Sequence, residues 1–112
     1  MFKASIYLPS ESNGEVINTD KRWQESRYTM RRLSEEFGGC TSIEAYGWWA
    51  NPEGELIGEH VTIIYSLVDA NEVEVRKSTA SVLRELAEHV KAVLNQQSVL
   101  ISIEPVTSVE FI

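Results

Sequence analysis

Residues 41–68 read TSIEAYGWWANPEGELIGEHVTIIYSLV, and their pattern predicts the central part of the fold. Two extended stretches, 41–49 and 56–68, flank the sequence Asn51-Pro52-Glu53-Gly54. Proline at the second position and glycine at the fourth favour a type I turn, so this region predicts a β-hairpin. In the second stretch the odd-numbered positions 61–67 are more apolar than the even-numbered ones, so we expect the odd face to meet the core.

The residues before this hairpin predict a strand and a helix. Apolar and polar side chains alternate over residues 2–8, which is typical of a half-buried strand, and residues 9–18 lack any period and predict a surface loop. Thr19 followed by Asp20 predicts a helix start, and Gly38-Gly39 predicts its end. The apolar side of this helix consists of Trp23, Met30, Leu33 and Phe37.

The residues after the hairpin predict a second helix and a last strand. Asn71 and Glu74 have the spacing of a capping box, and the helix should end near Asn95. A strand is expected over residues 99–104, where Pro105 interrupts it. Residues 106–112 alternate again and predict a C-terminal tail, an edge strand or an arm on a partner chain. The apolar side of the second helix consists of Val75, Val82, Leu83, Leu86, Val90, Val93 and Leu94.

The order strand, helix, strand, strand, helix, strand resembles the ferredoxin-like split βαβ architecture over residues 2–105. The resemblance rests on element order and on the central hairpin. It implies an α+β fold, with a four-stranded antiparallel sheet and two helices on one face. It also implies that residues 1–112 form a single domain and that the second sheet face is open. Proteins of this fold commonly cover that face by dimerising or use it to bind ligands.

The net charge, the short apolar stretches and the single cysteine disfavour several classes of binding partner and location. Ten Lys and Arg against seventeen Asp and Glu give a net charge of -7, which disfavours nucleic acid and anionic membranes. The longest apolar stretch, 61–68, is too short to span a bilayer, and the first residues lack the pattern of a secretory signal. The lone Cys40 cannot form an intramolecular disulfide, which favours a cytoplasmic location.

Strand alternation places a group of rings on the expected open face. Tyr7 and His60 would share that face with two aromatic residues of the neighbouring strand, Tyr46 and Trp48. An exposed surface of this kind marks an interface or a pocket, so we expect a dimer interface, a small-molecule surface or both. The predicted ligand-binding residues are Tyr7, Tyr46, Trp48 and His60.

His60 is the candidate for acid–base chemistry because imidazole titrates near neutrality. The alternative is a structural histidine held by hydrogen bonds. His89 is expected on the solvated side of the second helix, and Cys40 is expected to be a small buried apolar residue. The sequence contains no HExxH motif, clustered histidines or phosphate-binding glycine pattern, so we expect no metal and no cofactor.

Five basic residues fall within twelve positions of the first helix, in an otherwise acidic chain. They would form a local anion site, a surface for an acidic partner or a solvated helix face. They are Lys21, Arg22, Arg27, Arg31 and Arg32.

Three functions remain open at the level of sequence. The leading interpretation is a small cytoplasmic binding or regulatory module that forms a homodimer through the open sheet face. The second is a small cofactor-free enzyme of the dimeric ferredoxin-like type, acting on a small organic substrate. The third is a structural subunit that docks on a larger assembly through its C-terminal strand.

Overall fold

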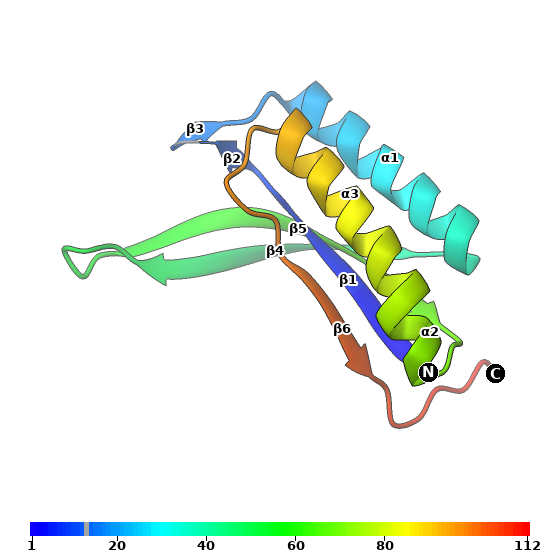
Figure 1. The fold of residues 1–112 in the computed structure, drawn as a ribbon. Helices are drawn as coiled ribbons and strands as arrows, with labels where there is room; N and C mark the ends of the chain where they lie inside the picture. The colour runs from blue at the N-terminus through cyan, green and yellow to red at the C-terminus, as the bar shows by residue number, and fades with distance from the viewer. Residues whose placement is uncertain (13) are drawn as a thin grey trace.

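The computed structural model describes residues 1–12 and 14–112 as a four-stranded antiparallel sheet with helices packed on one side (Figure 1). The strands lie in the order β4-β5-β1-β6, so the first and last predicted strands are neighbours. This arrangement confirms the α+β, ferredoxin-like prediction. The strands are β1 (Phe2–Pro9), β4 (Thr41–Ala50), β5 (Leu56–Val68) and β6 (Ile101–Pro105).

The helix α1 (Thr19–Phe37) begins one residue earlier than the sequence predicted, because Asn18 and not Thr19 is its N-cap. The Asn18 side chain accepts a hydrogen bond from the Lys21 amide at 3.1 Å. At the other end Gly38 has φ 88°, a left-handed conformation that glycine adopts without strain. Leu33 is fully buried as predicted, but Trp23 is 57% exposed, so its assignment to the buried side was wrong.

The second helix has three parts: α2 (Glu72–Glu74), the π-helical turn η1 (Val75–Thr79) and α3 (Ala80–Val93). The capping box is present, since the Asn71 side chain accepts from the Glu74 amide and the Glu74 side chain accepts from the Asn71 amide. The π-helical turn was not predicted from the apolar pattern. Most of the predicted apolar side is buried against the sheet: Val75, Leu83, Leu86, Val90 and Leu94.

Strand register shows which face of β5 meets the helices. Ile6 of β1 pairs with Ile64 of β5, and both are fully buried in the core on the helix side. The even-numbered residues of β5 therefore face the helices, and the sequence-based choice of the odd face was wrong. Polar side chains could be buried there because they have partners: the Ser66 hydroxyl donates to the Gly39 carbonyl at 2.7 Å, and Thr62 donates to Glu44.

The segment predicted as a loop contains a small hairpin, β2 (Glu11–Ser12) paired with β3 (Glu15–Val16). Asn13, which the loop prediction included, lies outside the described residues. The Glu59 carboxylate attaches this segment to the main sheet. Its Oε1 accepts from the amides of Ser10 and Glu11 at 3.1 and 3.0 Å.

The C-terminal strand runs over 101–105 and not over 99–104. Residues 106–112 form no strand, which corrects the predicted extra edge strand, and the Val106 amide donates to the Met1 carbonyl at 2.9 Å. The β4–β5 hairpin extends well beyond the helices (Figure 1), and the longest dimension of the chain is 43 Å. None of the described helices combines the length and the apolar character needed to cross a membrane.

Candidate functional site

A pocket of about 240 Å³ lies between α1 and the sheet, beside strands β4 and β5. Four polar side chains from three elements meet in it: Arg22 from α1, Glu44 from β4, and His60 and Thr62 from β5. The hairpin register places Glu44 directly opposite Thr62. The first turn of α1, fixed by the Asn18 cap, carries Arg22 over this pair.

The four side chains form one hydrogen-bonded network around the Glu44 carboxylate. Thr62 Oγ1 donates to Glu44 at 3.0 Å, and His60 Nε2 lies 2.7 Å from Glu44 Oε2. Arg22 Nη2 lies 3.5 Å from Glu44 Oε2, 3.3 Å from Thr62 Oγ1 and 3.1 Å from His60 Nδ1. The positive charge of Arg22 therefore compensates the negative charge of Glu44 at the pocket.

The partners of His60 determine its tautomer. A guanidinium group only donates hydrogen bonds, so Nδ1 must accept from Arg22. Nε2 then carries the proton and donates it to Glu44. Because both ring nitrogens have partners, the neutral imidazole in this arrangement has no free lone pair for a substrate proton. This geometry suits a binding and positioning role for His60 better than a role as general base.

The rest of the pocket combines apolar surface with hydroxyl groups. Trp23 and Met30 of α1 line one side, and the Trp23 side chain, exposed at 57%, leaves its ring available to a ligand. Ser26 is buried at the back, and its hydroxyl donates to the Arg22 carbonyl at 3.0 Å. Such a mixture of aromatic surface and polar groups fits a small organic molecule.

Two predicted site residues continue from the pocket along the hairpin. The Tyr46 ring lies 5.3 Å from the His60 ring and 6.4 Å from the Trp48 ring, measured between centroids. Tyr46 and Trp48 are 68% and 62% exposed. The structure thus brings His60, Tyr46 and Trp48 together on the helix side of the sheet, and not on the open face where they were expected.

Tyr7 is separated from this group. It pairs with Ile63, so its side chain lies on the opposite face of the sheet from His60. The contacts of Arg22 and Thr62 in the pocket were not predicted from the sequence. The register that places residue 44 opposite residue 62 follows from the pairing of Asn51 with Glu55, whereas the predicted turn at 51–54 would have placed residue 44 opposite residue 61.

The open face of the sheet carries a large apolar surface. Ile43, Trp49 and Leu100 are exposed at 44%, 46% and 60%. Tyr7, Val61, Ile63, Tyr65 and Leu67 lie on the same face and are partly exposed.

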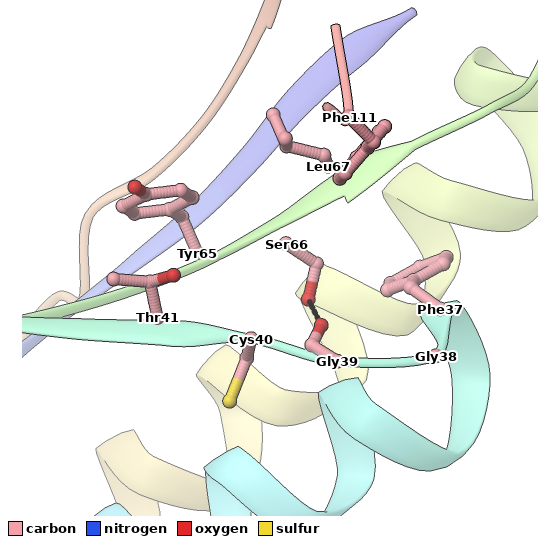
Figure 2. Close-up of a pocket in the computed structure, with 9 residues that line it drawn as sticks. All are labelled: Phe37, Gly38, Gly39, Cys40, Thr41, Tyr65, Ser66, Leu67 and Phe111. Atoms are coloured by element: carbon pink, nitrogen blue, oxygen red, sulfur yellow. Dashed lines mark hydrogen bonds between the residues drawn. The ribbon is translucent and has the colours of Figure 1, made fainter.

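A second pocket, of about 280 Å³, lies at the end of the sheet where α1 leads into β4 (Figure 2). Figure 2 shows Phe111 of the C-terminal tail near Leu67, and Tyr65 and Ser66 on opposite sides of β5. Cys40 is only partly buried, less than predicted, with its Sγ 3.6 Å from the Met30 carbonyl oxygen. The lining is mostly apolar and contains no charged side chain, so this pocket is the weaker candidate for specific binding.

His89 was predicted on the solvated side of the second helix, and its side chain is 37% exposed but contacts α1. Its Nε2 is 2.8 Å from Glu25 Oε2, and its ring centroid is 4.4 Å from that of Tyr28. These contacts join α3 to α1, so His89 has a structural role. Within residues 1–12 and 14–112 there is no group of three or more His, Cys, Asp or Glu that could hold a metal ion.

The chain matches no protein-family model, and no curated protein matches its sequence. Solved structures with a similar fold do exist. A phage SAM lyase in complex with S-methyl-5'-thioadenosine aligns with 92% of this chain and 79% of its own, at 14% identity and a TM-score of 0.64. A phage SAM lyase in its apo state aligns at 16% identity and a TM-score of 0.64.

The CutA proteins are similar to this chain at lower TM-scores. A point variant of CutA1 from Pyrococcus horikoshii covers 98% of this chain and 87% of its own, at 14% identity and a TM-score of 0.54. The periplasmic divalent cation tolerance protein CutA from Archaeoglobus fulgidus covers 98% of this chain and 88% of its own, at 11% identity and a TM-score of 0.54. At such low identity these similarities establish the ferredoxin-like fold, and they leave the activity open.

Proposed function

We propose that this chain is a small binding module that takes up a small organic molecule in the pocket beside His60 and acts as a self-associated assembly. The observation that carries the proposal is the closed network of Arg22, Glu44, His60 and Thr62 next to the exposed Trp23 ring. Such a network holds polar groups in fixed positions while the ring offers stacking surface. The engagement of both His60 nitrogens favours binding over proton transfer.

Self-association through the open sheet face is the second part of the proposal. That face carries the exposed side chains of Ile43, Trp49 and Leu100, and contiguous apolar surface of this kind is usually covered by a partner. A second copy is the partner that is always present, and two-fold dimers are the commonest assemblies. A cytoplasmic location belongs to the same proposal, supported by the single cysteine and the lack of a second thiol in the chain.

Ligand titration tests the binding part. S-methyl-5'-thioadenosine and adenosine are suitable first probes because each has an aromatic base for stacking and hydroxyls for hydrogen bonding. We expect chemical-shift changes at Trp23, His60 and Thr62, and at least tenfold weaker binding in Trp23→Ala. Val73→Ala, an exposed position on α2, is the matched control. A panel of such molecules that leaves the pocket signals unchanged would contradict the proposal.

Sedimentation equilibrium tests the assembly. Leu100→Lys places a charge on the open face at a residue that is 60% exposed, so it should weaken association without disturbing the core. Val73→Lys, at 62% exposure, is its control. A monomer at micromolar concentration for the unmodified chain would refute self-association.

A second candidate is a lyase acting on SAM, favoured by the similarity to the phage SAM lyase over 92% of this chain. In this case His60 would have to lose its contact with Arg22 before Nδ1 could accept a proton. Incubation with SAM, followed by chromatographic detection of S-methyl-5'-thioadenosine, separates the two functions. Product formation that depends on His60 favours the enzyme, and tight binding without turnover favours the module.

A further inference from the structure

The outer edge of β4 carries backbone N–H and C=O groups that have no strand to pair with among the described residues. β4 is an edge strand of the main sheet and pairs, within the described residues, with β5 alone. At the turn the Asn51 amide donates to the Glu55 carbonyl at 2.9 Å, which identifies that pair as hydrogen-bonded. Since hydrogen-bonded and non-hydrogen-bonded pairs alternate, the odd residues of β4 bond to β5. The outward N–H and C=O groups belong to Ser42, Glu44, Tyr46, Trp48 and Ala50.

This edge lacks the features that usually prevent strand addition. Edge strands are commonly protected by proline, lysine, a bulge or short length. β4 has ten residues in uninterrupted register, no proline, no lysine and one charged side chain, Glu44. The opposite edge strand, β6, has five residues and ends with Glu104 and Pro105. The unprotected edge is therefore specific to β4.

We propose that β4 pairs antiparallel with β4 of a second copy about a two-fold axis at Tyr46. In this register all five outward residues find a partner, because position 42 lies opposite position 50 and position 44 lies opposite position 48. An axis at Glu44 would place two carboxylates opposite each other, which destabilises a strand pair. An axis at Trp48 would leave the outward groups of Ser42 and Glu44 unpaired.

Charge complementarity supports a second copy as the occupant. In the Tyr46 register the partner's hairpin turn, with its exposed Glu53 and Glu55, comes alongside the beginning of β4. The C-terminal half of α1 lies beside that region, since the Met30 carbonyl contacts Cys40. Here Arg27 and Arg31 are exposed and line a groove. Two acidic side chains thus approach two basic ones, in a chain whose overall charge of -7 would otherwise oppose association.

The pairing also changes the binding pocket. Position 48 of one copy lies opposite position 44 of the other, so the partner's Trp48 comes beside Glu44 at the pocket mouth. The Glu44 side chain is 57% exposed in the single chain and would be covered there. Each pocket would then be completed by an aromatic ring of the other copy. This consequence rests on the proposed function, whereas the strand pairing itself does not.

Cysteine scanning in a Cys40→Ser background tests the pairing. Tyr46→Cys should form a disulfide-linked dimer on oxidation, because paired residues have Cα atoms within disulfide range. Ala50→Cys should not, because its two copies would lie eight residues apart along the pair. Combining Ser42→Cys with Ala50→Cys should restore the crosslink. Absence of the Tyr46→Cys dimer, or equal crosslinking of Ala50→Cys alone, would overturn the proposal.

Proline substitution gives a second test that leaves the fold intact. The Tyr46 amide points away from β5, so Tyr46→Pro removes a donor from the free edge and none from the β4–β5 ladder. We expect at least tenfold weaker association, with native circular dichroism, and no such loss in Tyr46→Thr. Unchanged association of Tyr46→Pro would contradict the strand pairing. Leu100→Lys distinguishes the open sheet face from the β4 edge. It should weaken association through the open face and leave the Tyr46→Cys crosslink at the β4 edge unchanged.

Discussion

Trp48 and Gly58 are cross-strand partners on the β4–β5 hairpin, and the indole ring lies directly on the glycine. A Cβ atom at Gly58 would come within 2.7 Å of the ring. This contact explains why a glycine occurs within a strand, where it otherwise lowers stability. It also fixes the orientation of one of the rings that extend from the pocket.

Gly58→Ala should therefore displace the Trp48 ring and destabilise the hairpin. Because the Trp48 ring is 62% exposed and can move aside, we expect a loss of stability below the about 1 to 3 kcal/mol that overpacking costs in a packed core. Gly47→Ala is a matched control on the same hairpin, because its Cβ would lie 3.5 Å from Val61, an ordinary contact. Urea denaturation and tryptophan fluorescence measure the difference. Equal stability and equal spectra for the two variants would show that the ring does not depend on Gly58.

Glu59→Leu should release the segment that contains β2 and β3 from the main sheet. The carboxylate accepts from two backbone amides, and leaving those donors without a partner costs about 1 to 3 kcal/mol. Hydrogen exchange at the amides of Ser10 and Glu11 should become faster. Glu59→Gln keeps an acceptor oxygen and should retain most of the protection. Protection in Glu59→Leu equal to that of the unmodified chain would contradict this role.

Leu33→Ala should be strongly destabilising because Leu33 has no exposed surface in the core between α1 and the sheet. Truncation of a buried leucine costs about 2 to 5 kcal/mol. Val73→Ala, at a side chain that is 62% exposed, should change the free energy of unfolding by less than about 0.5 kcal/mol. Chemical denaturation measures the free energy of unfolding of both variants. A smaller decrease in Leu33→Ala than in Val73→Ala would refute the assignment of Leu33 to the core.

The contact between Glu25 and His89 should couple the two long helices. The Glu25 side chain is only 14% exposed, and the Tyr28 ring lies against the imidazole. A double-mutant cycle of Glu25→Ala and His89→Ala should give a coupling energy of at least about 0.5 kcal/mol. The exposed pair of Arg76 and Glu72 serves as the control, with an expected coupling below about 0.5 kcal/mol. A smaller coupling for Glu25 and His89 than for the control pair would contradict the structural role of His89.

The element order could be predicted because each segment carries its own local signal. Gly38-Gly39 ends α1, Asn71 and Glu74 start the second helix, and the proline and glycine at 51–54 make the hairpin turn. These signals depend on a few neighbouring residues, so a single sequence contains them.

The faces of β5 could not be predicted in the same way, because apolar side chains occur on both faces of this central strand. Ile63 and Ile64 are equally apolar, so hydrophobicity alone gives no preference between adjacent positions. The deciding interaction is the pairing of Ile6 with Ile64, between residues far apart in the sequence. Because the two faces of β5 were assigned the wrong way round, His60 was predicted on the open face and not on the helix side.

Arg22 was missed as a pocket residue for a related reason. The basic residues of α1 resemble a solvated helix face in the sequence, and only the packing of α1 on β5 shows that one of them points inward. The side chain of Arg22 is 20% exposed, whereas Arg27 and Arg31 are exposed residues. Helix–sheet docking, which no local pattern encodes, makes this distinction.

The π-helical turn at Val75–Thr79 gives the chain a place where its length can vary. An α-helical turn contains 3.6 residues, whereas this wider turn accommodates about one more. Removing the exposed Ser78 would convert it to an ordinary turn and leave the buried side chains on both sides in phase. The same deletion inside α3 would rotate every later residue by about 100° and expose the core. Single-residue length differences among natural variants of this chain should therefore concentrate at this turn.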